Sequence, residues 1–181
     1  MTTTITFRVQ EDADNEFLRR LFAAVLDAAL GLHAWPERER ECMLRLQYDA
    51  RERDWGKRHP PGRLEIIEAD GVPAGRIRLS QPEADASRRV VDLAVLPGFR
   101  RRGLASAALV RHGEEFRLNV SRTNLPAQRL YDRNGFAPHG GDALDLYLHR
   151  PPLHMAVPAR SQLRAFRHVA DRLHAPAERI W

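Results

Sequence analysis

The first residues that could do chemistry form a basic turn, which reads Arg-Arg-Arg-Gly-Leu-Ala-Ser over residues 100–106. An apolar run at 90–96 precedes the turn, and a helical pattern that reaches Leu109 follows it. The first amides of a helix have no partner inside the helix and carry partial positive charge, so such a turn suits an anion. Gly103 lets the backbone approach a ligand, because glycine has no Cβ. The turn predicts a phosphate-type site, with an arginine-rich helix start that binds nothing as the alternative.

A second group of polar residues lies on a short helical pattern further along the chain. It consists of Asn124, Ala127 and Tyr131, and Gly135-Phe136 follow it. An asparagine at this position can cap the helix start. A tyrosine on an amphipathic helix is either a packing residue or, with an ordinary pKa near ~10, a proton donor.

Periodicity predicts the elements that position these residues. Residues 5–9 alternate as a strand, a helix with an apolar stripe then runs to Gly31, and a charged helix covers residues 37–55. We expect Met43, Leu46 and Ala50 to form the buried face of that second helix. Residues 64–69 and 76–79 predict an antiparallel hairpin with a somewhat long loop at Asp70-Gly71.

The remaining pattern alternates strands with helices. It predicts a central strand at 90–96, a helix from 103 to about 112, a strand at 116–120, a short helix ended by Asn134-Gly135, and a last strand at 144–148. The order β-α-α-β-β-β-α-β-α-β is that of an α/β (α+β) protein with a mixed central sheet flanked by helices.

Composition limits the function classes. The chain has 181 residues, 43% hydrophobic and 29% charged, a formal charge of +5 and a pI near 10.3. This suits one domain and an anionic ligand. No apolar run approaches the ~20 residues of a membrane span, so we expect no membrane partner. Cys42 is the only cysteine and no secretory signal precedes it, which favours a cytoplasmic protein. The histidines show no metal-ligand spacing, and we expect no metal.

The spacing Arg-x-x-Gly-x-Ala is neither a GxxxxGKS/T nor a GxGxxG motif. It resembles the acyl-CoA pyrophosphate loop, Q/R-x-x-G-x-G/A, of the GNAT family, the GCN5-related N-acetyltransferases. The Asn124, Ala127, Tyr131 and Gly135-Phe136 pattern resembles the segment N-x-x-A-x-x-x-Y, then G-F, of the same family, near its ribosomal-protein alanine N-acetyltransferase branch. The resemblance spans residues 5–148 and implies the GNAT acyl-CoA N-acyltransferase fold over residues 1–150.

This resemblance implies a role for each matched residue. Backbone groups of Leu93, Ala94 and Val95 would meet the pantetheine arm and the acetyl carbonyl of acetyl-CoA, the co-substrate. Asn124 and Ala127 would lie near the pantetheine end, and Tyr131 would protonate the leaving thiolate. The pyrophosphate would be held by Arg100, Arg101, Arg102, Gly103, Leu104, Ala105 and Ser106.

The family pattern fails at the general base and in one helix length. The alanine-acetyltransferase branch carries a glutamate where this chain has Asn119, which cannot act as a base. Asp92 is the replacement candidate, with a strand carboxylate paired to an arginine as its alternative; Glu65 and Glu68 are further candidates. Only fifteen positions separate Gly103 from Leu118, about two helical turns fewer than is usual, which predicts a shortened helix.

Residues 151–181 form an extension, in which Leu163, Phe166, Val169 and Leu173 predict an extra C-terminal helix at about 161–173. We expect this stripe to pack on its own domain or, like the shortened helix region, to support a homodimer. A basic helix on an anionic membrane surface or nucleic acid is the alternative.

These observations favour an acetyl-CoA-dependent N-acetyltransferase acting on a small-molecule or peptide amine. A non-catalytic acyl-CoA-binding module of the same fold is the first alternative, because Asn119 replaces the expected base. A nucleic-acid-binding protein is the second, and the absence of a recognisable nucleic-acid motif counts against it.

Overall fold

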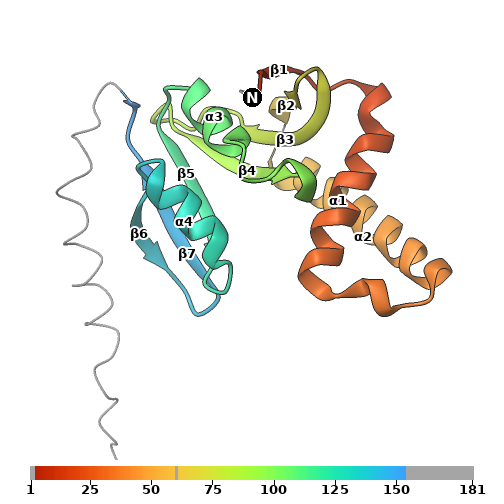
Figure 1. Ribbon diagram of the computed structural model, residues 1–181. Helices are drawn as coiled ribbons and strands as arrows, with labels where there is room; N and C mark the ends of the chain where they lie inside the picture. Colours follow the sequence, from red (N-terminus) through yellow and green to blue (C-terminus); the bar gives the residue numbers. More distant parts are fainter. Residues whose placement is uncertain (1–2, 60, 154–181) are drawn as a thin grey trace, which may run out of the picture.

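The computed structural model describes residues 3–59 and 61–153 of the chain. Figure 1 shows a sheet whose two halves turn away from each other, with helices on both sides of the first half. The sheet has seven strands in the order β1-β2-β3-β4-β5-β7-β6. Their bounds are β1 (Ile5–Val9), β2 (Pro61–Ala69), β3 (Val72–Ser80), β4 (Arg88–Val95), β5 (Phe116–Ser121), β6 (Ala137–Gly141) and β7 (Asp145–Arg150). All neighbours pair antiparallel except β4 and β5, which confirms the mixed sheet.

Four α-helices accompany the sheet: α1 (Asn15–Leu30), α2 (Glu37–Arg58), α3 (Leu104–Arg111) and α4 (Leu125–Arg133). Alternate residues of β4 face different helices, as the period of a strand requires. Ala94 packs with residues of α1 and α2, whereas Leu93 and Val95 pack in the core beneath α3. Tyr131 and Leu130 of α4 belong to that same second core. Thus α1 and α2 cover one face, and α3 and α4 cover the other.

The hairpin between β2 and β3 is tighter than the sequence predicts. Its connection contains only Asp70 and Gly71, and both adopt a left-handed conformation, with φ of 53° and 78°. Two positive φ values in succession match the twist of the flanking strands, which is why an Asp-Gly pair closes a two-residue turn.

The expected buried face of α2 is wrong for Leu46 and Ala50, whereas Met43 is half-buried. Leu46 is 59% exposed and Ala50 is exposed, whereas Tyr48 is buried against Phe22 of α1. The side of α2 that faces the core carries Leu44, Tyr48, Arg51, Glu52 and Trp55. Two of these five side chains are charged, and hydrophobic periodicity alone cannot detect a charged inner face.

The sequence also misses β6. Its residues, Ala-Pro-His-Gly-Gly, carry neither the alternation nor the branched side chains of a typical strand. A proline is tolerated there because β6 lies at the sheet edge, where an amide facing away from the partner needs no hydrogen bond. The predicted helix at 161–173 lies outside the described residues.

The helix after the basic turn is short, as the sequence predicts. α3 spans eight residues, and Arg150 of β7 completes its C-terminal end from another part of the chain. Arg150 Nη1 donates to the Leu109 carbonyl at 2.9 Å, and Nη2 donates to the His112 and Glu114 carbonyls at 3.1 and 3.3 Å. The last carbonyls of a helix lack hydrogen-bond donors within the helix. The buried guanidinium of Arg150 supplies the donors that the amides of a longer helix would provide.

Candidate active site

The site begins where β4 and β5 separate. The two strands pair only at Arg88 with Phe116 and at Arg89 with Arg117. Beyond these pairs β4 continues to Val95 and β5 to Ser121, and Figure 1 shows the two strands diverging. Among the residues that the structure describes, the last part of β4 therefore has no strand partner on one of its two edges.

The free edge exposes backbone groups of the residues that the sequence singles out. The Leu96 amide donates to the Ala74 carbonyl of β3 at 2.9 Å. In an antiparallel pair, hydrogen bonding alternates along the strand, so the amide and carbonyl of Leu93 and Val95 point away from β3, toward the gap. Ala94 uses its backbone toward β3 instead. The Val95 carbonyl accepts a bond from Arg100 Nε at 3.2 Å, which leaves the Val95 amide in the gap.

The basic turn has the backbone of an anion-binding loop. Arg101 and Gly103 adopt left-handed conformations, with φ of 63° and 86°, and Gly103 is the N-cap of α3. A Cβ built on Gly103 would meet nothing within 4 Å, so space above this amide is open. The side chain of Leu104 is buried, which leaves only its backbone for a ligand.

The arginines of the turn differ from most others in this chain. Arg100, Arg101 and Arg102 are exposed, and none pairs with a carboxylate among the residues that the structure describes. Arg102 stacks on Phe99 at 5.2 Å. Three uncompensated cations at a helix N-terminus favour an anionic ligand.

The end of α4 is linked to the first turn of α3 by one polar contact. Asn134 Nδ2 donates to Ser106 Oγ at 3.1 Å and to the Leu130 carbonyl at 2.7 Å, which ties α3 to the end of α4. At the other end of α4, Asn124 Oδ1 accepts from the Ala127 amide at 3.2 Å. Asn124 is therefore a helix cap, and its Nδ2 remains for a second role.

Tyr131 lies on the inner side of α4. It is only 9% exposed, and its ring meets that of Phe136 edge-on at 5.4 Å. Burial, together with the negative charge of Asp92, raises the pKa of Tyr131 to about 12. The phenol is thus fully protonated at neutral pH, which is the state that a proton donor needs.

Asp92 lies on β4, three residues before Val95, on the face covered by α1 and α2. Its Oδ2 accepts from Nε and Nη2 of Arg76 at 3.0 and 2.8 Å. Arg76 is 2% exposed and also donates to Glu52 of α2 at 3.1 Å. The structure therefore shows the arginine pairing that was the alternative to a catalytic role, and the base role stays a prediction.

The other candidate bases have partners away from the gap. Glu65 is buried and lies 2.9 Å from His112 Nε2, at the end of α3. Glu68 accepts from Arg8 at 2.8 Å, near the sheet edge formed by β1. Neither contact brings a carboxylate to Tyr131 or Val95.

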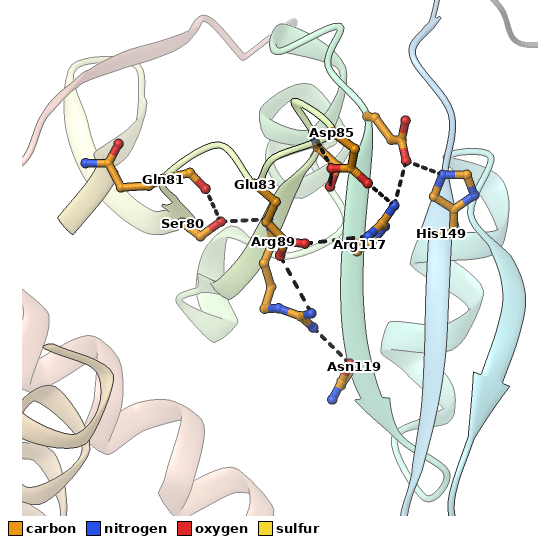
Figure 2. A network of polar contacts seen from close by, with 10 residues as sticks. Ser80, Gln81, Glu83, Asp85, Arg89, Arg117, Asn119 and His149 are labelled. Atoms are coloured by element: carbon orange, nitrogen blue, oxygen red, sulfur yellow. Dashed lines mark hydrogen bonds and ion pairs between the residues drawn. The ribbon is translucent and has the colours of Figure 1, made fainter. Parts of the chain in front are cut away.

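Asn119 is exposed on β5, on the face opposite the buried Leu118 and Val120. Its Oδ1 accepts from Arg89 Nη1 at 3.2 Å, and Figure 2 shows both side chains beside Arg117, which pairs with Glu83 and Asp85. A shallow hollow of about 200 Å³ surrounds Asn119. The hollow is lined by Arg89, Arg117, Leu118, Asn119, His139, Tyr147 and Leu148.

Residues 3–59 and 61–153 contain no cluster of three or more histidine, cysteine or acidic side chains that could hold a metal. No helix within this part of the chain is long and apolar enough to cross a membrane.

Comparisons with known proteins identify one matching family and several solved structures with a similar fold. The model of the acetyltransferase (GNAT) family matches residues 19–136. The PaiA N-acetyltransferase of Thermoplasma acidophilum, solved with coenzyme A, superposes with a TM-score of 0.63 and 18% identity, covering 82% of this chain and 99% of that one.

Two other solved structures share the fold. FdhC, described as a nucleotide-linked sugar GNAT, gives a TM-score of 0.59 at 16% identity and covers 97% of this chain and 98% of its own. RimL, a ribosomal alpha-N-protein acetyltransferase solved with coenzyme A, gives 0.57 at 14% identity and covers 83% and 95%. No curated protein sequence matches significantly.

Proposed function

Because the chain belongs to the GNAT acetyltransferase family, we propose that it is an N-acetyltransferase that uses acetyl-CoA to acetylate an amine directly. The observation that carries this proposal is the gap between β4 and β5. One end of the gap adjoins the basic turn, and the free backbone edge of β4 lines it. Tyr131 on α4 packs in the same core as Leu93 and Val95 of that edge.

The residues present fit acetyl-CoA. A pyrophosphate suits the amides at the start of α3 and the three arginines that have no carboxylate partner in the described chain. The amide-rich pantetheine arm suits a strand edge, because it can pair with the backbone of Leu93 and Val95. When bound there, acetyl-CoA supplies an activated thioester carbonyl. Two of the relatives were solved with coenzyme A, which supports this choice.

The chain would contribute three actions to the transfer. The Val95 amide donates a hydrogen bond to the carbonyl oxygen as negative charge develops on it. As the C–N bond forms and the C–S bond breaks, Tyr131 donates its proton toward the sulfur. A base takes the proton that the amine releases, and Asp92 is the candidate for this step. The amine must enter uncharged, and freeing a lysine-like amine at neutral pH costs about 4–5 kcal/mol.

Ligand-dependent stability tests the cofactor half of this proposal. Acetyl-CoA should raise the melting temperature, because a ligand that binds only the folded chain stabilises it. Transfer is then measured with radiolabelled acetyl-CoA and a panel of small amines and peptides. The absence of any shift at millimolar acetyl-CoA would refute both the enzyme and the acyl-CoA-binding alternative.

The non-catalytic acyl-CoA-binding module is the second candidate. Two observations favour it. Position 119 carries the side-chain amide of asparagine in place of a carboxylate, and Asp92 is hydrogen-bonded to Arg76. Under this reading acetyl-CoA binds, and no amine in the panel is acetylated above the uncatalysed rate.

A further inference from the structure

A buried charged cluster joins α2 to the sheet on the face opposite α3. The arginine cluster comprises Arg51 and Glu52 of α2, Arg76 and Arg78 of β3, and Asp92 of β4. Glu52 accepts from Arg76 at 3.1 Å and from Arg78 at 2.7 Å, and Arg76 also binds Asp92. Arg76 and Arg78 are 2% and 7% exposed. Three guanidinium groups thus share two carboxylates.

Arg51 is the cation without a carboxylate. Its guanidinium lies between two aromatic rings, 4.2 Å from the centre of Phe22 and 4.3 Å from that of Trp55. Its Nε is enclosed without a hydrogen-bond partner, and no carboxylate lies within ion-pair distance of it in residues 3–59 and 61–153. Burial lowers the pKa of Arg51, and the neighbouring charge of Arg76 lowers it further.

Partial burial of this guanidinium has a desolvation cost, its stacking on two rings offsets part of that cost, and an anion at its N–H groups would offset more. Partial removal of a charge from water is costly, and here the nearby carboxylates are engaged by other arginines. Stacking between two rings fixes the plane of the guanidinium and leaves its N–H edge as the part that can bind. That edge matches the geometry of a carboxylate or a phosphate.

The arginine cluster lies next to the proposed point of transfer. Asp92, which belongs to the cluster, is three residues before Val95 on β4. The charge of Asp92 raises the pKa of Arg51 and also that of Tyr131, so this carboxylate is within electrostatic reach of both. A ligand on Arg51 would therefore lie on the face of β4 that α1 and α2 cover.

We propose that Arg51 binds an anionic group of the acceptor, so that the preferred substrate is an amine that also carries a carboxylate or a phosphate. This inference rests on the proposed N-acetyltransferase function. It assigns the acceptor a negative charge close to its reacting amine. The alternative is that Arg51 only packs between Phe22 and Trp55, in which case the acceptor's charge has no effect.

Matched amine pairs test the inference on the wild-type protein. Beta-alanine is compared with its amide, and phosphoethanolamine with ethanolamine, in acetyl transfer and in calorimetric titration of the CoA-loaded protein. We expect the anionic member of at least one pair to have a kcat/KM about tenfold to a hundredfold higher, the size of a charge-assisted hydrogen bond. The first pair reports on carboxylate, and the second on phosphate.

Variants then locate the effect. Arg51→Gln should reduce the ratio of kcat/KM between anionic and neutral amines to about one, mainly through KM. Arg51→Lys keeps the positive charge but loses the paired N–H donors of the guanidinium, so it should give an intermediate ratio. It also tests the inference if Arg51→Gln does not fold. The control is Arg53→Gln, because Arg53 is exposed on the same helix; its ratio should match the wild type.

The outcomes separate this inference from the proposed function. Acetylation without preference for an anionic amine, or a preference that persists in both Arg51 variants, overturns the inference and leaves the acetyltransferase intact. If no amine is acetylated, the enzyme proposal fails, and titration decides the inference alone. In that case, binding of beta-alanine or phosphoethanolamine that depends on Arg51 supports the anion site, and equal or absent binding refutes it.

Discussion

Arg76 donates two hydrogen bonds, from Nε and Nη2, to a single carboxylate oxygen of Asp92, at 3.0 and 2.8 Å. Within the described part of the chain, Asp92 Oδ1 accepts no hydrogen bond. The pair therefore fixes the orientation of the carboxylate and leaves one oxygen for a proton. An orienting partner beside a base with one free oxygen is the arrangement that a catalytic carboxylate needs, although the same contact also serves structure alone.

Replacing Asp92 distinguishes the two roles. If Asp92 is the base, Asp92→Asn lowers kcat by about a hundredfold or more, the usual contribution of general base catalysis. Glu52→Gln is the matched control, because it removes the other carboxylate that binds Arg76. Equal loss of stability and of kcat in both variants would show that Asp92 only holds Arg76.

Tyr131→Phe tests the proton donor. We expect kcat to fall by about a hundredfold or more, and the dissociation constant for CoA to change by less than about threefold, because only the hydroxyl is lost. The Phe ring keeps the edge-on contact with Phe136, so the melting temperature should stay near that of the wild type. An unchanged kcat would remove Tyr131 from the reaction.

The pH profile gives an independent check on Tyr131. Its pKa is raised to about 12, so the active protonated form persists below that value and is lost only as the pH rises through it. Between about pH 8 and 10, the kcat of the wild type should therefore not fall through deprotonation of Tyr131. Over this range its pH profile should have the same shape as that of Tyr131→Phe. A decline in the kcat of the wild type with a midpoint near pH 9, absent from Tyr131→Phe, would contradict the raised pKa of Tyr131.

Charge reversal in the basic turn tests the pyrophosphate site. Arg102→Glu should raise the dissociation constant for CoA by about tenfold at low salt, and added salt should reduce this effect, because exposed charges are screened. Arg20→Glu is the control, since Arg20 is exposed on α1 and has no ion pair among the described residues. If the two variants bind CoA equally well, the turn does not hold the pyrophosphate.

The sequence predicts the parts of the fold whose signals are local. Alternation identifies β1, and the apolar run at 90–96 identifies β4. Gly31 ends α1 with a φ of 65°, as expected of a left-handed cap. The backbone conformation of the basic turn is likewise local, because it depends on residues adjacent in the chain. In contrast, β6 forms because it pairs with β7, and residues 137–141 carry no local pattern that predicts this pairing.

The charged part of the site cannot be deduced in the same way. Arg76 and Arg78 alternate with Ile77 and Leu79, a pattern that predicts a solvent-facing side for the arginines. They are buried because α2 covers that face and supplies Glu52. The spacing of Tyr48, Arg51, Glu52 and Trp55 is helical, but this stripe is recognisable only when charged side chains are allowed to face the core.

Arg150 gives a final prediction, on stability. It is 1% exposed, donates to three backbone carbonyls near the end of α3, and stacks on Phe116 at 4.7 Å and Phe136 at 5.2 Å. Burial lowers its pKa to about 10, so it is still charged at neutral pH. Arg150→Met should lower the free energy of unfolding by about 2–3 kcal/mol, because three carbonyls lose a charged donor while the cost of burying a cation is also removed.

Urea denaturation of Arg150→Met and of Arg129→Met measures this difference. Arg129 is an exposed residue of α4, and its replacement should change the free energy of unfolding by no more than about 0.5 kcal/mol. Hydrogen exchange should also quicken at the last turn of α3 in Arg150→Met, since the end of this short helix depends on β7. Equal stability of the two variants would mean that the hydrogen bonds of Arg150 only offset the cost of burying it. The end of α3 would then be maintained by packing of Leu109 and Ala108 alone.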